Sequence, residues 1–236
     1  MANPNGPYPG RQLFAGLTKA EHPCFAYLVT GRSPESRQRV AVQVDNTVRM
    51  GPIGDAPYDP LRHYSAVKFD DATGTLAVSN GIQTEAVYEM YKLLVNVGSA
   101  RAEQYLRTIM EGADAEPDSY HTPRIAACLF PALDGSGLEC MAAIKADGAP
   151  AAVYRVPGSP GMLSGVSVYK GDLAKPEARD PQSGLTALEC AATSPAELAA
   201  GLYDLSAAEY DGNDIRVCAV AGVWNGETWE LAIRNR

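Results

Sequence analysis

Glu116-Pro117-Asp118-Ser119-Tyr120-His121-Thr122-Pro123-Arg124 runs directly into the apolar segment 125–130, and this stretch decides how the chain is organised. Pro117 and Pro123 fix their own φ and push the residue before each of them towards an extended conformation. The sequence therefore predicts a stiff, extended entry into a strand, with Arg124 at its mouth. Carboxylates, an imidazole and a guanidinium on stiff backbone suit positioned proton transfer. A polar surface loop without chemistry is the alternative.

Short apolar runs on both sides of this stretch indicate β-strands, since they alternate or are rich in strand formers and are bounded by turn residues. Two helices are expected before the stretch and one after it. Strands, two helices, strands, one helix and strands in that order predict an α+β protein: two mainly antiparallel sheets stacked face to face with helices outside, a four-layer αββα sandwich. Because no linker or repeat is visible, residues 1–236 are interpreted as one domain. The expected strands are 12–17, 23–30, 40–44, 63–69, 76–78, 125–130, 138–145, 151–156, 162–169, 215–223 and 228–233.

The three helices are predicted from apolar spacing and capping residues. The first, over about 81–96, has its apolar face at i, i+3, i+4 and i+7, with Asn80 and Gln83 at N-cap and N3 spacing. The second covers 100–110. The third begins at Ser194-Pro195-Ala196-Glu197, a capping box with proline at the first helical position. The apolar face of the first helix consists of Val87, Met90, Tyr91 and Leu94.

The composition limits the classes of partner. A formal net charge of −8 over 236 residues argues against nucleic acid or an anionic membrane held by bulk electrostatics. No apolar run approaches the roughly 20 residues that a membrane-spanning helix needs. Residues 1–10 lack the pattern of a signal peptide. The five cysteines are dispersed without a C-x-x-C pair, so we expect reduced thiols and a cytoplasmic location.

One basic cluster stands out in this acidic chain: Thr30-Gly31-Arg32-Ser33-Pro34-Glu35-Ser36-Arg37-Gln38-Arg39. The arginine fork and the serine hydroxyl suit a phosphate. A solvated loop whose arginines pair with local acids such as Glu35 is the alternative. The junction at Asn80-Gly81, between a strand and a helix, could likewise present backbone N–H groups to an anion or simply cap the helix.

Common catalytic signatures are absent from the sequence. There is no phosphate-binding loop of the G-x-x-x-x-G-K-[ST] type, no G-x-S-x-G, no H-E-x-x-H and no dinucleotide-binding glycine motif. His22, His63 and His121 lack the spacing of metal ligands, so no metal site is expected.

Four segments taken together resemble the stand-alone IMP cyclohydrolase family of purine biosynthesis. They are Tyr8-Pro9-Gly10-Arg11, the basic cluster from Thr30 to Arg39, Ser79-Asn80-Gly81-Ile82-Gln83-Thr84, and the stretch from Glu116 to Arg124. The resemblance implies an αββα fold like that of the N-terminal-nucleophile (Ntn) hydrolases. It also implies closure of 5-formamidoimidazole-4-carboxamide ribotide to inosine monophosphate (IMP) with loss of water and without a cofactor. Glu85-Ala86 departs from the family pattern.

The resemblance also suggests a role for each matching residue. The expected partner is a small purine ribotide, while nucleic acid and membrane are not expected and assembly into a homo-oligomer is left open. Histidine is a common acid–base residue near neutral pH, but His121 lies outside the family pattern. For the 5′-phosphate or nearby ribotide the candidates are Arg32, Ser33 and Arg37, with Arg11 as an additional one; for the base or formyl oxygen they are Asn80, Gly81 and Thr84. The candidates for proton transfer and charge stabilisation are Tyr64, Glu116, Asp118 and Arg124.

Two alternative functions fit the sequence less well. An autoprocessed amidohydrolase needs Ser, Thr or Cys as a new N-terminus, but Met1-Ala2-Asn3 offers none and Cys24 lies inside a strand pattern. A purine-ribotide-binding protein without turnover, or with altered specificity, would keep the phosphate arginines. The set of Glu116, Asp118 and Arg124 argues against it, because binding alone does not require paired acids beside an anionic ligand.

Overall fold

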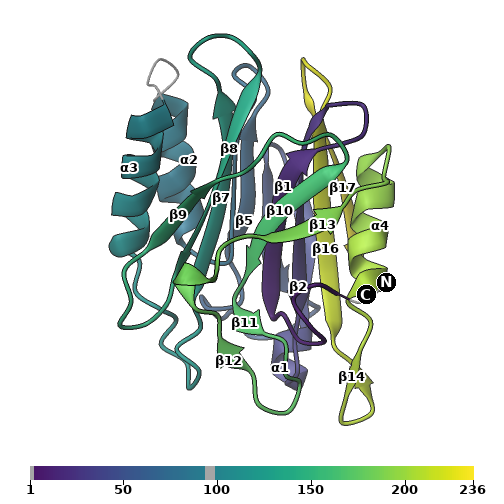
Figure 1. Ribbon diagram of the computed structural model, residues 1–236. Coiled ribbons are helices and arrows are strands. Elements are labelled where there is room, and N and C mark those ends of the chain that lie inside the picture. Colours follow the sequence, from purple (N-terminus) through teal and green to yellow (C-terminus); the bar gives the residue numbers. More distant parts are fainter. Residues whose placement is uncertain (1–2, 94–98) are drawn as a thin grey trace.

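Two antiparallel β-sheets lie face to face at the centre of the structure, and helices cover their outer faces (Figure 1). The computed structural model describes residues 3–93 and 99–236. One sheet has the strand order β13-β10-β1-β2-β16-β17, and the other runs from β3 to β9 in sequence order. The predicted α+β class with two stacked antiparallel sheets is confirmed.

The first sheet consists of β1 (Arg11–Leu17), β2 (Pro23–Thr30), β10 (Met162–Ser167), β13 (Thr186–Glu189), β16 (Arg216–Trp224) and β17 (Trp229–Asn235). The second consists of β3 (Arg39–Val44), β4 (Thr47–Pro52), β5 (Ser65–Asp70), β6 (Thr75–Ser79), β7 (Arg124–Pro131), β8 (Leu138–Lys145) and β9 (Ala152–Arg155). Two small hairpins pair β11 (Tyr169–Lys170) with β12 (Glu177–Ala178), and β14 (Glu209–Tyr210) with β15 (Asn213–Asp214).

The helices are α1 (Pro34–Arg37), α2 (Gln83–Leu93), α3 (Ser99–Glu111) and α4 (Pro195–Leu205), with a 3₁₀ turn at Pro181–Ser183. α2 and α3 pack on the seven-stranded sheet, and α4 packs on the six-stranded sheet. The predicted cap of α4 is present, because the Ser194 hydroxyl accepts a hydrogen bond from the N–H of Glu197 at 3.3 Å. No helix in the described part of the chain is both long and apolar enough to cross a membrane.

The alternation of side chains along the strands explains why the sheets stack in this way. In β7, Ile125, Ala127 and Leu129 point into the core between the sheets. Their neighbours Ala126 and Cys128 pack beneath the helices on the other face. Because successive side chains point to opposite faces, a strand covered on both sides reads as a continuous apolar run. The apolar run 125–130 is therefore the middle of a doubly covered sheet.

The start of the first predicted helix differs from the expectation. α2 begins at Gln83, and the Asn80 side chain does not cap it: its oxygen accepts from the N–H of Ile125 at 2.9 Å and from the Gln83 side chain at 2.9 Å. Tertiary contacts with β7 have taken the side chain that local spacing assigned to the helix. The predicted end of the helix, residues 94–96, lies outside the described residues. Two strands of the large sheets, β4 and β13, the short strands β12, β14 and β15 of the small hairpins, and the one-turn helix α1 were not predicted.

The stretch before β7 folds back on itself and is not extended throughout. Arg124 does begin β7 as expected. Before it, the N–H of Glu116 donates to the carbonyl of Thr122 at 2.9 Å, and His121 adopts a positive φ of 46°. The prolines stiffen the ends of this loop, while a turn between them brings Glu116 and Thr122 together.

Candidate active site

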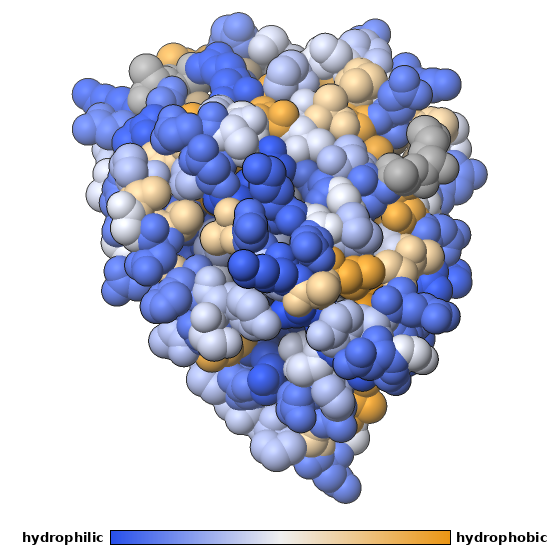
Figure 2. Space-filling model, turned by 60° about the horizontal axis from the view of Figure 1, so that its bottom comes forward, coloured by the Kyte–Doolittle hydropathy of each residue, from blue (hydrophilic) through white to orange (hydrophobic). Residues whose placement is uncertain are grey.

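A polar cavity of about 420 Å³ opens at the end of the molecule that carries α1 and the two small hairpins (Figure 1). Hydrophilic residues gather in the middle of this face (Figure 2). Arg11 of β1, Thr30 at the end of β2 and Arg39 at the start of β3 all line it. The cavity therefore lies where strand ends from both sheets converge.

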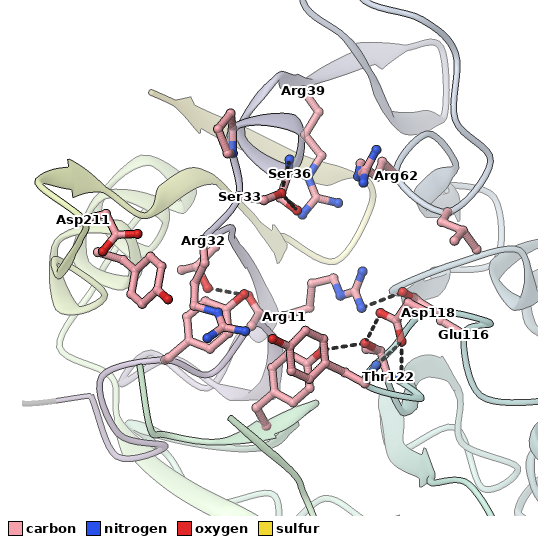
Figure 3. Close-up of a pocket in the computed structure, with 18 of the residues that line it drawn as sticks. Arg11, Arg32, Ser33, Ser36, Arg39, Arg62, Glu116, Asp118, Thr122 and Asp211 are labelled. Carbon is pink, nitrogen blue, oxygen red and sulfur yellow. Dashed lines mark hydrogen bonds and ion pairs between the residues drawn. The ribbon is translucent and has the colours of Figure 1, made fainter. Parts of the chain in front are cut away.

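One end of the cavity, which we call the anion end, combines two arginines with two serines: Ser33, Ser36, Arg39 and Arg62 (Figure 3). Ser33 and Ser36 lie side by side, with 3.0 Å between their hydroxyl oxygens. Arg39 is only 4% exposed, and its Nε and Nη1 have no hydrogen-bond partner among the described residues. Leaving buried N–H groups without acceptors costs free energy, so this position favours a bound anion that accepts their hydrogen bonds. Arginine suits a phosphate in particular.

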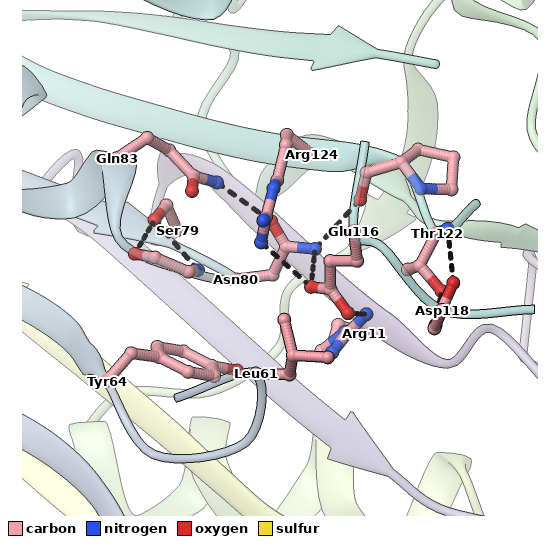
Figure 4. A network of polar contacts seen from close by, with 12 residues as sticks. Arg11, Leu61, Tyr64, Ser79, Asn80, Gln83, Glu116, Asp118, Thr122 and Arg124 are labelled. Atoms are coloured by element: carbon pink, nitrogen blue, oxygen red, sulfur yellow. Dashed lines mark hydrogen bonds and ion pairs between the residues drawn. The ribbon is translucent and has the colours of Figure 1, made fainter. Parts of the chain in front are cut away.

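A second group of charges, the Glu116 network, consists of Arg11, Asn80, Glu116 and Arg124 (Figure 4). Glu116 is 3% exposed and lines the cavity. One carboxylate oxygen accepts from Nη2 of Arg11 at 2.9 Å, and the other from Nη1 of Arg124 at 3.1 Å. The Asn80 amide nitrogen lies 3.5 Å from the second oxygen and donates to the carbonyl of Pro123 at 2.8 Å. Both oxygens of Glu116 are therefore engaged by positive charge.

The electrostatics of this network leave one positive charge in excess. Burial is the largest single influence on Arg11 and opposes its charge, but the Glu116 carboxylate and three neighbouring tyrosines together outweigh burial and raise the pKa of Arg11. For Arg124, burial prevails over the attraction of Glu116, and repulsion by Arg11 adds to it, so its pKa is lowered. Arginine nevertheless stays protonated at neutral pH. Two guanidiniums and one carboxylate thus present a net positive charge that can stabilise a developing oxyanion.

Comparison with known proteins identifies the family of this chain. The family described as "IMP cyclohydrolase-like protein" matches residues 8–228. The chain belongs to this family. Curated IMP cyclohydrolases from Methanocaldococcus jannaschii and Methanococcus aeolicus are 36% and 31% identical to it over 124 residues each. These matches cover 52% of this chain and 56% and 58% of the two relatives, so the chain spans about half the length of the curated relatives it matches.

The residues that the sequence assigned to phosphate are separated in this IMP cyclohydrolase-like chain. Ser33 lies at the anion end, where it caps α1 by accepting the N–H of Ser36 at 3.1 Å. Arg37 does not line the cavity; its guanidinium donates to the backbone carbonyls of Gly31 and Arg32. Arg37 therefore shapes the loop from within.

Arg32 lines a different wall of the cavity from the anion end. Its guanidinium lies 5.1 Å from the ring centres of Tyr8 and Tyr120 and 5.3 Å from that of Tyr210. It also donates to the carbonyl of Leu173 at 2.8 Å. Cation–π contacts of this kind hold arginine against aromatic rings. Arg32 joins the N-terminal segment, the loop before β7 and the β14–β15 hairpin around the cavity mouth.

Tyr64 lies behind the Glu116 network and is 7% exposed (Figure 4). Its hydroxyl is 2.8 Å from that of Tyr27. Burial raises the pKa of both tyrosines above the ordinary value, so both hydroxyls keep their protons at neutral pH. In this environment Tyr64 is suited to donate a hydrogen bond and poorly suited to accept a proton as a base.

Asn80, Gly81 and Thr84 form a supporting layer behind Arg124 and do not line the cavity. A Cβ at Gly81 would lie 2.5 Å from Nη1 of Arg124, so glycine leaves room for the guanidinium. The Thr84 hydroxyl lies 3.0 Å from the carbonyl of Gly81 and contacts Ser79. The three residues that were assigned to the base or formyl oxygen thus fix the position of Arg124 and the β6–α2 junction.

Asp118 lines the cavity but is engaged by its own loop. Its carboxylate accepts from the N–H groups of Tyr120 at 3.2 Å and Thr122 at 2.9 Å, and from the Thr122 hydroxyl at 2.6 Å. His121 points elsewhere: it is exposed and lies 3.4 Å from Asp147. The structure brings Arg11, Glu116 and Arg124 together, whereas Asp118 shapes the turn that carries Glu116.

Sequence reasoning missed several residues of the cavity. Arg39 and Ser36 stand in the basic cluster that was singled out, but nothing in their spacing tells which arginine turns inward. Arg62 follows the Pro/Asp-rich turn, which gave no signal of binding. The tyrosines of the mouth come from four separate segments, so only the fold unites them: Tyr8, Tyr120, Tyr169 and Tyr210.

Proposed function

We propose that this chain is an IMP cyclohydrolase, which closes 5-formamidoimidazole-4-carboxamide ribotide to IMP with loss of water. Family membership supports this proposal. The observation that carries it concerns one cavity. It holds both the buried guanidinium of Arg39, two of whose nitrogens have no partner within residues 3–93 and 99–236, and the paired charges of Arg11 and Glu116. A ribotide has a phosphate at one end and a reacting base at the other. Arg39 matches the phosphate, and the Arg11–Glu116 pair matches the base.

The anion end would hold the 5′-phosphate. Arg39 supplies two nitrogens, Nε and Nη1, that have no hydrogen-bond partner among the described residues, and Ser33 and Ser36 supply hydroxyls. Arg62 adds a second guanidinium from the loop between β4 and β5. This assignment replaces Arg32 and Arg37 with Arg39 and Arg62 as the phosphate arginines. The tyrosine rings at the mouth offer faces on which a planar base can stack.

Ring closure requires little beyond position and charge. The carboxamide nitrogen attacks the formyl carbon of the same molecule, so holding both groups in a reactive conformer supplies much of the acceleration. The former formyl oxygen becomes negative in the transition state and then leaves as water, with one proton from the carboxamide nitrogen and one from the formamido nitrogen. Arg11, held by Glu116, would stabilise that oxygen. An intramolecular dehydration of this kind needs no cofactor.

Glu116 fits a positioning role better than that of a free base. Both its oxygens already accept hydrogen bonds from arginine, so neither is free to contact a proton of the substrate. Tyr64 lies behind the network as a proton-bearing hydroxyl. We further propose that the stacked sheets form an Ntn-hydrolase-like αββα domain over residues 1–236, with the cyclohydrolase site at the open end, in a cytoplasmic enzyme.

The test is a turnover assay on the purified protein in chelator, followed by ultraviolet absorbance. We expect the formamido ribotide to be converted to IMP. Arg39→Met should raise KM by about 10–150-fold, since a charge-assisted bond contributes roughly 1.5–3 kcal/mol. Arg49→Met, at an exposed position on β4, makes the same change in charge and serves as control. No conversion under any condition, with IMP still bound, would instead favour a ribotide-binding protein without turnover.

A further inference from the structure

The turn from Asp59 to His63 holds Arg62 at the anion end through a closed set of hydrogen bonds. The carbonyl of Asp59 accepts from the N–H of Arg62 at 3.0 Å and of His63 at 2.8 Å. One carboxylate oxygen of Asp59 accepts from the N–H of Leu61 at 2.8 Å, and the other from Nη1 of Arg62 at 2.6 Å. Asp59 therefore fixes both the backbone and the side chain of Arg62.

His63 closes the turn from the other side. Its Nδ1 accepts a hydrogen bond from the N–H of Asp59 at 2.8 Å. A backbone N–H can only donate, so Nδ1 must carry a lone pair, and the imidazole must be neutral. His63 is 5% exposed, and the Tyr58 ring lies 5.3 Å from it, with the Tyr58 hydroxyl donating to the carbonyl of His63 at 3.2 Å. The imidazole is enclosed in the one state that the turn requires.

We propose that His63 and Asp59 are positioning residues for ligand binding, and that protonation of His63 releases Arg62 from the anion end. A proton on Nδ1 would face the N–H of Asp59, donor against donor, and the hydrogen bond that closes the turn would be lost. Arg62 would then no longer be held beside Ser36 and Arg39. This inference rests on the proposed function only for the identity of the ligand, a phosphate ester of a nucleoside.

The charged groups around His63 act in both directions. Arg39 of β3 and Arg62 of its own turn oppose a positive imidazole, whereas Asp59 favours it. Glu35 of α1 lines the same small cleft beside His63. Burial is the largest influence, and it lowers the pKa of His63 below the ordinary value of about 6.5. The neutral form therefore prevails at pH 7, and the turn opens as the pH falls through the lowered pKa of His63.

The experiment compares dissociation constants for IMP at pH 8 and pH 5 between the parent and His63→Asn. Asparagine places an acceptor oxygen near the position of Nδ1 but does not titrate. The phosphate of the ligand also titrates in this range, but its effect cancels in the ratio of the two constants. We expect the ratio of parent to variant to rise by at least about threefold from pH 8 to pH 5, because each pH unit below a pKa reduces the neutral, binding-competent form about tenfold. His22→Asn, at an exposed position, should leave the ratio constant.

Arg62→Met supplies a second readout that does not depend on His63 variants. Removing Arg62 should weaken binding at pH 8 by about tenfold or more and much less at pH 5, where the parent has already lost this contact. A ratio for His63→Asn that does not change with pH, or an equal cost of Arg62→Met at both pH values, would overturn the inference. If the parent fails to bind IMP, the proposed function fails, and the same ratios measured with inorganic phosphate still decide the role of His63. A parent that binds neither ligand overturns both.

Discussion

Glu116 is the residue on which the charges of the cavity depend, because it is the counter-ion of two buried arginines. Arg11 comes from β1 and Arg124 from β7, and each contacts a different oxygen of the carboxylate. Removing one member of a buried ion pair leaves an uncompensated charge, which costs far more than the pair gains when it is intact. Variants of Glu116 and its two arginines must therefore be tested for the free energy of unfolding as well as for turnover.

We expect Glu116→Gln to lower the free energy of unfolding by about 3–5 kcal/mol, as loss of a buried counter-charge does. Turnover should fall as well, because Arg11 loses the carboxylate that orients it. Asp118→Asn in the same loop is the matched comparison. Its amide oxygen can still accept hydrogen bonds from backbone N–H groups, so the free energy of unfolding should fall by only about 1 kcal/mol. Urea unfolding and single-turnover rates on the same preparations measure both effects, and equal losses of stability in the two variants would contradict the account.

At the scale of elements, the junction between β6 and α2 sets the position of Arg124. Asn80 follows β6, and its oxygen accepts the N–H of Ile125 in β7. Gly81 then passes close under the Arg124 guanidinium. The sequence predicted a strand, a glycine and a helix here, and these are present. It assigned Asn80 to helix capping because local spacing cannot show that β7 lies alongside.

We expect Gly81→Ala to displace Arg124 from Glu116, since the added Cβ would lie 2.5 Å from Nη1 of Arg124 and 2.9 Å from Oε1 of Gln83. Overpacking at a buried site costs about 1–3 kcal/mol. Turnover should fall by about tenfold, the effect of raising a barrier by roughly 1.4 kcal/mol. Gly51→Ala in β4, where a Cβ meets nothing within 4 Å, is the control. Full turnover in Gly81→Ala would show that Arg124 does not need this position.

At the scale of the whole molecule, the sequence predicts more of the two sheets than of the cavity. Apolar runs such as 125–130 predict strands because side-chain alternation and burial are local in sequence. The stacking of two antiparallel sheets follows from the order of strands and helices. The cavity depends on which side chains turn inward where β1, β3 and the loops meet, and this is decided by long-range packing. Arg39 and Arg37 look equivalent in sequence, yet only Arg39 faces the cavity.

The most direct measurement of the central claim is a crystal structure of the protein with IMP bound. The account predicts phosphate oxygens within hydrogen-bond distance, about 2.7–3.2 Å, of Nε or Nη1 of Arg39 and of the Ser33 or Ser36 hydroxyl. It also predicts the purine ring at the other end, against Arg11 and Glu116. A nucleotide bound outside this cavity, or one whose phosphate leaves the Arg39 guanidinium without a partner, would contradict it.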